Sequence, residues 1–98
     1  GGEQQMLAIG RALMLRPSCI MLDEPTTGLA PKIAKEISRI ISNLNAEGMS
    51  VLWVEQNAIV ATSIAQYYYI MREGKVVAEG RTSELPENKK EYFKNYYI

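Results

Sequence analysis

The chain has 98 residues, of which 47% are hydrophobic and 22% are charged, a composition typical of a single globular domain. Eleven basic residues balance eleven acidic ones, so the sequence offers no support for a nucleic-acid-binding surface, which needs clustered Lys and Arg. The single cysteine excludes an internal disulfide and a zinc site built from several cysteines. No apolar stretch approaches the ~20 residues of a membrane span, and we expect a reducing, intracellular compartment.

The first part of the chain predicts a helix, a strand and a loop. Apolar residues at helical spacing predict a helix over residues 3–15, ended by Pro17. Residues 18–22 predict a short strand, apolar on both sides as in a parallel sheet that is covered on both faces. Within this strand we expect Cys19 to be a small buried hydrophobic side chain. Residues 25–31 form the expected loop.

The middle of the chain predicts a second helix and a second strand. Pro31 suits the first turn of this helix, and Gly48 suits its C-terminal stop. Residues 50–54 predict another buried strand, and Asn57 is a suitable N-cap for a short helix through Ala65. The longer helix presents one apolar face at helical spacing, which consists of Ile33, Ile37, Ile40, Ile41 and Leu44.

The remaining residues predict a hairpin and a last helix. Residues 67–71 and 75–78 predict two antiparallel strands joined by a turn that contains Gly74. Residues 82–83, a Thr-Ser pair, are suitable caps for the last helix, with Pro86 early in it. We expect an aromatic cluster to dock this helix on the body of the domain, and its members are Tyr92, Phe93, Tyr96 and Tyr97.

Polar clusters follow both of the apolar strands. Asp23 and Glu24 follow the first strand, and Glu55, Gln56 and Asn57 follow the second. Strands that alternate with helices predict an α/β fold with parallel strands, in which ligands bind outside the carboxyl ends of the strands. We therefore expect both clusters at one edge of the sheet, where they form a candidate site. Glu55 either supports this site or is a surface or capping residue.

An apolar strand that ends in Asp-Glu suits the chemistry of phosphoryl-transfer ATPases. Asp23 would bind Mg²⁺ beside the β- and γ-phosphates of ATP, and Glu24 would polarise a water for attack on the γ-phosphate. The metal would offset the repulsion between the two carboxylates. The same pattern also fits an ordinary capped strand end, so the acidic pair alone leaves both interpretations open.

The chain opens on GGEQQ, which begins the first helix. Glycines at this place let a phosphate approach backbone N–H groups, and the helix dipole favours an anion there. A flexible end or a tag remnant would explain the same residues, so this segment alone decides nothing.

Taken together, in this order and at this spacing, these segments resemble the ATPase family of ABC transporters over essentially the whole chain. GGEQQ resembles the tail of the signature motif LSGGQ, and residues 11–13 match the RAL that follows it. Residues 19–24 resemble Walker B, residues 27–30 resemble the D-loop, and residues 54–57 fall at the switch-histidine motif. The resemblance implies that residues 1–98 are the C-terminal part of one P-loop NTPase domain, with parallel strands, helices, and a C-terminal hairpin and helix.

The resemblance also implies a role for each matching residue. Asp23 would help to hold Mg²⁺, and Glu24 would be the general base for ATP hydrolysis. The signature segment would meet the γ-phosphate of an ATP molecule that is bound mainly by a second ATPase subunit, in a head-to-tail dimer. Its nucleotide-binding residues would be Gly1, Gly2, Glu3 and Gln4.

Two positions depart from the family's pattern. Gln56 stands where the switch histidine usually lies, and a glutamine can hydrogen-bond a phosphate oxygen or the attacking water but cannot take up a proton near neutral pH. We therefore expect Gln56 to serve catalysis by positioning, without a proton role. Ala30 stands where the D-loop usually ends in Asp, so an intersubunit contact is missing or replaced.

The sequence contains no G-x-x-x-x-G-K-[ST] P-loop. Without that lysine and its backbone cradle, the phosphates have no main site, so we expect the 98-residue piece to be inactive and the parent protein to bind and hydrolyse ATP. The resemblance implies that the P-loop strand, which lies between strands 50–54 and 67–71, is absent as well. We expect exposed sheet edges and an apolar face, and hence a dimer, a swap or a rearranged sheet.

The strings VEQNA and TTGLAP resemble the shorter of the two ATPase subunits in branched-chain amino acid importers, and related importers of urea or short amides use similar ATPases. The resemblance implies a peripheral protein on the cytoplasmic face of the plasma membrane. Its partners would be a second ATPase subunit, transmembrane permease subunits and an extracytoplasmic substrate-binding protein. Two alternatives stay open: a non-catalytic interaction module with this fold, and an ABC ATPase of DNA repair or translation.

Overall fold

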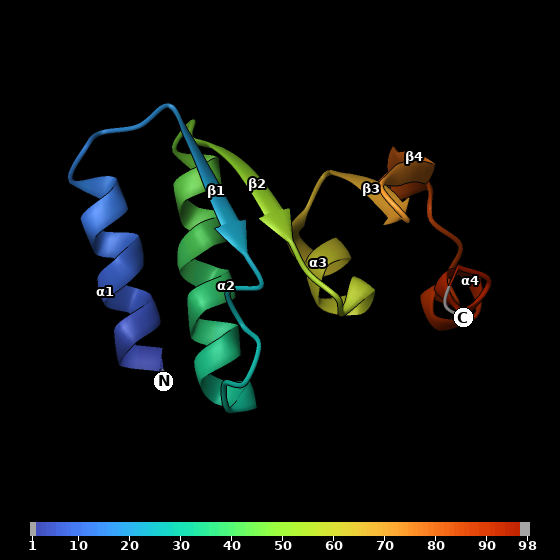
Figure 1. Cartoon of the computed structure of the whole chain (residues 1–98), viewed down its shortest axis with the longest axis horizontal. Helices are drawn as coiled ribbons and strands as arrows, with labels where there is room; N and C mark the ends of the chain where they lie inside the picture. The colour runs from blue at the N-terminus through green and yellow to red at the C-terminus, as the bar shows by residue number, and fades with distance from the viewer. Residues whose placement is uncertain (1, 97–98) are drawn as a thin grey trace. The chain divides into compact units, whose positions relative to one another are not determined.

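The computed structural model describes residues 2–96 and divides into two compact units, Gly1–Gln56 and Asn57–Ile98. Figure 1 shows the order of the helices and strands along the chain. Within residues 2–96, no helix combines the length and the apolar character that a membrane crossing requires.

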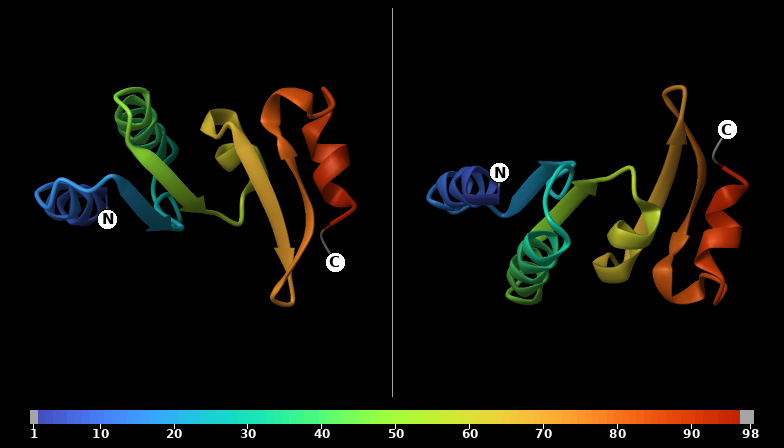
Figure 2. Two further views of the ribbon diagram at one scale, coloured as in Figure 1. Left: turned by 90° about the horizontal axis from the view of Figure 1, so that it is seen from above. Right: turned by 90° about the horizontal axis from the view of Figure 1, so that it is seen from below.

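The first unit consists of helices packed on a small parallel sheet. Strands β1 and β2 pair in parallel, with Cys19 opposite Ser50 and Asp23 opposite Val54. Figure 2 shows α1 and α2 on the same side of this sheet. The elements in chain order are α1 (Gly2–Leu13), β1 (Cys19–Asp23), α2 (Pro31–Ala46) and β2 (Ser50–Val54).

The core of this unit lies between the sheet and the helices. Alternate residues of β1, Ile20 and Leu22, are buried, as expected for a strand with one covered face. They are joined by Ile9 from α1 and by Ile37 and Ile41 from the predicted apolar face of α2. The predicted face is therefore correct at its centre, whereas Ile40 and Leu44 are half-buried and Ile33 is 38% exposed.

The end of α2 confirms the predicted glycine stop. Gly48 has a φ of +105°, a left-handed conformation that suits glycine. The N–H of Met49 donates to the carbonyl of Leu44 at 3.1 Å, and the N–H of Gly48 donates to that of Asn45 at 3.0 Å. This pair of bonds is the Schellman motif, which satisfies the last carbonyls of a helix.

The prediction that both faces of the sheet are covered is wrong for one of them. Met21, Leu52 and Val54 on this face are 76%, 50% and 53% exposed. Cys19 is exposed as well, and not the buried side chain that its apolar neighbours suggested. The physical reason is that both helices of the unit cover the other face, so apolar residues on this one have no cover within the unit.

The predicted boundaries at the start of the chain also need small corrections. Helix α1 ends at Leu13, and Met14 and Leu15 lie in a turn with exposed side chains. Strand β1 begins and ends one residue later than predicted, because Asp23 still pairs with Val54.

The second unit contains a short helix, a hairpin and a last helix. Asn57 caps α3 as predicted, and its Oδ1 accepts hydrogen bonds from the N–H groups of Ile59 and Val60 at 3.1 and 3.2 Å. The hairpin turn has positive φ at Glu73 (51°) and Gly74 (77°), which is the pattern of a type I′ turn. The elements are α3 (Ala58–Ile64), β3 (Tyr67–Arg72), β4 (Lys75–Arg81), η1 (Thr82–Glu84) and α4 (Lys89–Lys94).

The predicted cap of the last helix is wrong. Thr82 begins the 3₁₀ turn η1, and its hydroxyl donates to the carbonyl of Ala65 at 2.6 Å. Helix α4 instead begins at Lys89 and is capped by Asn88, whose side chain accepts from the N–H of Glu91. A Thr-Ser pair suits either kind of turn, and Pro86 lies between the two.

Aromatic side chains dock α4 on the hairpin, as the sequence predicted. Phe93 is buried, and its ring lies edge-to-face with that of Tyr68 on β3. The hydroxyls of Tyr68 and Tyr92 are hydrogen-bonded at 2.8 Å, and the ring of Tyr96 lies beside that of Tyr92. Tyr97 lies outside the described residues.

Candidate functional site

The parallel register brings the two polar clusters to one edge of the sheet. Asp23 is the last residue of β1 and lies opposite Val54, the last residue of β2. The N–H of Glu24 continues the pairing by donating to the carbonyl of Val54 at 2.7 Å. Asp23 and Glu24 therefore lie beside the start of the Glu55-Gln56 segment, as the alternation of strands and helices predicted.

Glu24 has an unusual backbone for an acidic residue. Its φ is +48°, a left-handed conformation that costs a residue with a side chain about 1 kcal/mol. The chain then turns sharply over the buried Pro25, with the N–H of Thr27 donating to the carbonyl of Glu24 at 3.2 Å. Arg16 and Glu73 have the same backbone conformation in other turns, so the interest of Glu24 lies in its position directly after the acidic strand end.

A third acidic residue, Glu55, connects the two strand ends. Its Oε2 accepts a hydrogen bond from the Thr26 hydroxyl at 2.8 Å and another from the Trp53 indole N–H at 3.1 Å. The sequence left open whether Glu55 supports the site or is a surface or capping residue, because the turn that brings Thr26 to it cannot be read from spacing. Gln56 follows it and is exposed.

The carboxylates suit a hard cation held jointly with phosphate oxygens. Asp23 is exposed and Glu24 is half-buried, so both side chains can be reached from solvent. In the part of the chain that the structure describes, no group of three or more His, Cys, Asp or Glu side chains is arranged to hold a metal. Mg²⁺ is usually bound through one or two carboxylates plus substrate phosphates, and this donor set therefore fits it.

Three of the four predicted signature residues, Gly2, Glu3 and Gln4, lie in the first turn of α1. Gly1 lies outside the described residues. Glu3 and Gln4 are exposed, and the neighbour that the structure gives to Gly2 is Ile33 of α2, which a β-carbon on Gly2 would overlap. The structure therefore gives Gly2 a packing reason, while its predicted role in nucleotide binding stays untested.

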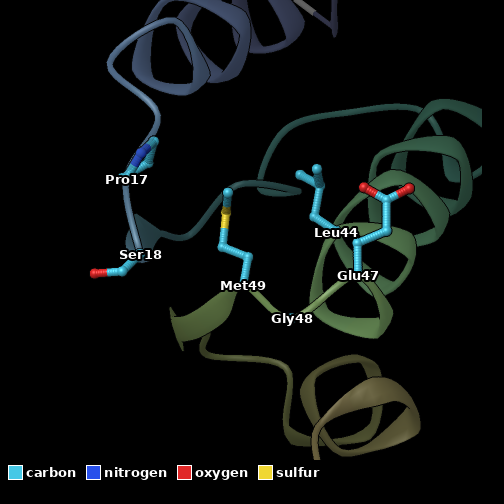
Figure 3. A pocket seen from close by; sticks show the side chains of 6 residues that line it. All are labelled: Pro17, Ser18, Leu44, Glu47, Gly48 and Met49. Atoms are coloured by element: carbon cyan, nitrogen blue, oxygen red, sulfur yellow. The ribbon is translucent and has the colours of Figure 1, made fainter.

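A pocket of about 250 Å³ lies at the opposite edge of the sheet from the acidic pair. Figure 3 shows Pro17 and Ser18 on the chain entering β1, Leu44 on α2, and the other lining residues on the turn between α2 and β2. Ligands of parallel α/β sheets bind at the carboxyl ends of the strands, whereas this pocket lies where the strands begin. The candidate site is therefore the edge with the acidic pair.

Curated proteins with similar sequences are ATP-binding proteins of transporters. The high-affinity branched-chain amino acid transport ATP-binding protein BraG of Pseudomonas aeruginosa is 49% identical over 90 residues, which is 92% of this chain and 39% of BraG. The probable branched-chain amino acid transport ATP-binding protein LivG of Methanocaldococcus jannaschii is 36% identical over 88 residues, 90% of this chain and 34% of LivG. The arginine transport ATP-binding protein ArtP of Haemophilus influenzae is 38% identical over 96 residues, 98% of this chain and 40% of ArtP. The chain thus spans less than half the length of these relatives.

Solved structures with the same fold are ATP-binding cassettes. One in its ADP conformation has a TM-score of 0.77 and 37% identity, over 83% of this chain and 32% of that structure. A bacterial cassette solved as a dimer has a TM-score of 0.76 and 34% identity, over 84% of this chain and 35% of that structure. No protein-family model matches the chain.

Proposed function

Because this chain resembles a part of the ATP-binding proteins of ABC transporters, we propose that it belongs to the ATP-hydrolysing subunit of an ABC importer. The observation that carries the proposal is the register of β1 and β2, since it sets Asp23 and Glu24 beside the Glu55-Gln56 segment. A strand end of this kind suits phosphoryl transfer, in which catalysis consists of positioning and electrostatic stabilisation.

The proposed substrate of the importer is a branched-chain or another hydrophobic amino acid. The support is the 49% identity with BraG, which is named for branched-chain amino acids. LivG, also named for branched-chain amino acids, is 36% identical, close to the 38% of ArtP, which is named for arginine. The substrate itself would contact other subunits.

In the proposed mechanism, Glu24 is the general base that accepts a proton from the attacking water. Its backbone is fixed by the bond to Val54, so the carboxylate is presented from a defined turn. Asp23 would hold Mg²⁺, which supplies charge neutralisation at the phosphates when bound. Gln56 would orient the water or a phosphate oxygen, because its amide offers both donors and an acceptor but no proton uptake.

The nucleotide would be shared between two subunits. The chain carries no P-loop, so we propose that ATP is held mainly by residues beyond this chain, and that the isolated 98-residue chain neither binds it tightly nor hydrolyses it. Gly1, Gly2, Glu3 and Gln4 would meet the γ-phosphate of ATP on a second subunit. A related cassette solved as a dimer with ADP and phosphate supports this arrangement.

The proposed assembly is that of an importer. It contains a second ATPase subunit, transmembrane permease subunits and an extracytoplasmic substrate-binding protein, and it places this subunit at the cytoplasmic face of the membrane. For the isolated chain, the exposed apolar face of β1 and β2 supports self-association or strand exchange between copies.

The test is ATP hydrolysis by the full-length protein that contains this chain. Replacing Glu24→Gln removes a general base, so we expect kcat to fall about 10²- to 10⁴-fold while nucleotide binding persists. Glu73→Gln is the matched control, because Glu73 is also a glutamate at positive φ but lies in the hairpin turn. Wild-type kcat in the Glu24→Gln variant would refute the assigned base.

The proposed transport substrate is tested separately. The full-length protein is reconstituted in vesicles with its permease and binding protein, and ATP hydrolysis is measured with leucine and with arginine. Leucine should stimulate hydrolysis, and stimulation by arginine alone would contradict the proposed specificity.

A further inference from the structure

We propose that Glu55 is a positioning residue of the strand-end site. Its carboxylate attaches the turn that contains Glu24 to the strand end that contains Gln56. The inference rests on the proposed function, because it assigns a residue that arranges the groups of the same hydrolytic site. Glu55 itself does not touch the reacting atoms in this proposal.

The Oε2 atom of Glu55 is the point at which two segments meet. The Thr26 hydroxyl donates to it at 2.8 Å from the turn after β1, and the Trp53 indole N–H donates to it at 3.1 Å from β2. We call these three residues the Glu55 hub. All three side chains are half-buried, and the hub joins positions that are 29 residues apart in the sequence.

The two donors contribute differently to the hub. Trp53 lies two residues before Glu55 on the same segment, so its indole N–H fixes the direction of the carboxylate. The Thr26 hydroxyl then attaches the turn to the carboxylate across the two strands. Hydrogen bonds to an ionised acceptor are stronger than neutral ones, and partial burial strengthens them further.

Glu24 and Gln56, the two residues proposed to act on the attacking water or the phosphate, are close to the Glu55 hub in the sequence. Glu24 lies two residues before Thr26, and its N–H donates to Val54, the residue directly before Glu55. Gln56 directly follows Glu55. The hub and the Glu24–Val54 bond therefore form two cross-links between the same two strand ends. With only one of them, the turn could pivot about the remaining bond.

Movement of the turn would be costly for catalysis. A displacement of about 1 Å at a catalytic group can lower the rate by 10²-fold, because reacting atoms must be held in line. A merely structural Glu55 would lower the stability of the whole unit and leave the local order of the turn and kcat unchanged. Local backbone exchange and kcat therefore distinguish the two roles.

The first measurement is hydrogen exchange in the full-length protein without nucleotide. Thr26→Val removes the donor, Glu55→Ala removes the acceptor, and Thr26→Ser keeps the hydroxyl. In the first two variants we expect the amides of Glu24, Thr27 and Leu29 to exchange about tenfold faster, as expected for the loss of one hydrogen bond to a charged group. Thr26→Ser should restore the wild-type exchange.

Thr82→Val is the matched control for these variants. It removes another threonine hydroxyl bond, the one to Ala65 at 2.6 Å, which lies in the second unit. It should leave the exchange of the turn amides unchanged. If it accelerated them as much as Thr26→Val does, the effect would be a general loss of stability and the proposal would fail.

The second measurement is steady-state ATP hydrolysis by the same variants. Thr26→Val and Glu55→Ala should each lower kcat about tenfold or more with KM for ATP unchanged. The double variant should be no slower than the slower single variant, because both changes break the same bond. Additive losses, or a rise in KM with an unchanged kcat, would overturn the positioning role.

The two proposals fail in different ways. If the wild-type full-length protein hydrolyses no ATP, the proposed function is wrong, and the exchange data still decide whether the hub holds the turn. If hydrolysis is found but the turn amides exchange at the wild-type rate in Glu55→Ala, the proposed function stands and the role of Glu55 is refuted.

Discussion

Gly2 in the first turn of α1 lies directly against Ile33 of α2, so that a β-carbon added to Gly2 would overlap the Cγ2 methyl of Ile33. The two helices approach closely at this point because position 2 has no side chain. Close packing of the two helices therefore explains a glycine at position 2, in addition to the phosphate binding that the family resemblance implies for it. Substitution of Gly2 should therefore affect stability as well as nucleotide binding.

The first prediction compares two glycines of the same helix. Gly2→Ala should lower the free energy of unfolding by about 1–3 kcal/mol, because the added methyl group is forced against the Cγ2 methyl of Ile33. Gly10→Ala should raise it by about 0.5–1 kcal/mol, since alanine favours the helix and nothing lies within 4 Å of an added β-carbon there. Urea unfolding of both variants beside the wild type measures the two changes.

A second substitution separates the clash from other effects of Gly2→Ala. Ile33→Ala in the Gly2→Ala background removes the methyl that the new β-carbon meets, so stability should recover in part. Equal stability of Gly2→Ala and the wild type would show that the helices do not approach as closely as described.

The second prediction concerns the metal. Asp23→Asn should leave the full-length protein able to hydrolyse ATP but raise the Mg²⁺ concentration for half-maximal rate about tenfold or more, because a ligand charge is lost. Glu24→Gln should lower the maximal rate without moving that concentration. A Mg²⁺ titration of the three proteins measures both quantities. If the Mg²⁺ concentration for half-maximal rate rose in Glu24→Gln and not in Asp23→Asn, the two residues would have the opposite roles.

Features with a local physical cause could be predicted from the sequence. The side chain of Asn57 caps the helix that directly follows it, and Gly48 ends the helix directly before it. The turn at Gly74 was indicated by a glycine between two strands, although the positive φ of Glu73 before it was not. Each of these depends on hydrogen bonds within five residues, so spacing and residue type were sufficient.

Features that depend on what covers a side chain could not be predicted from the sequence. Cys19 and Met21 have apolar neighbours in the sequence but lie on the face of the sheet opposite the helices. In the same way, Thr82 was expected to cap a helix, but its hydroxyl bonds to Ala65, 17 residues away. The sequence has no local signal for such contacts.

The sequence predicted where the candidate site lies, but not the hydrogen bond between Thr26 and Glu55 that supports it. Parallel strands alone were enough to bring Asp23 and Glu24 to the edge that Gln56 shares. The bond between Thr26 and Glu55 depends on the left-handed backbone at Glu24, which redirects the chain. A positive φ at a glutamate is not signalled by residue type, so the hub was visible only in the structure.

The third prediction is self-association of the isolated 98-residue chain. Met21 is 76% exposed and lies opposite Leu52 on the uncovered sheet face, so burial of this face should drive association. Sedimentation should show dimers or larger species, and Met21→Lys should shift them toward monomers. Met14→Lys is the control, since Met14 is 83% exposed but lies after α1. A monomeric wild type would contradict the prediction.

The fourth prediction is an alkaline loss of stability in the second unit. The hydrogen bond with Tyr68, together with burial, raises the pKa of Tyr92 above its ordinary value of 10.0. The folded state thus favours the neutral phenol, and the stabilisation is complete below pH 10 and lost as the pH rises through the folded pKa. We expect α4 to detach from the hairpin in that range, because tyrosinates cannot keep the same contact with Phe93 and Tyr68.

Unfolding followed by circular dichroism between pH 8 and about 11.5, beside tyrosinate absorbance, measures this loss. Tyr92→Phe removes the titrating hydroxyl, so its stability should be lower than that of the wild type at pH 8 and should fall less as the pH rises. Tyr69→Phe is the control, because Tyr69 is exposed on β3 and takes no part in the Tyr68–Tyr92 bond. The same decline with pH in Tyr92→Phe and the wild type would show that another group causes the alkaline transition.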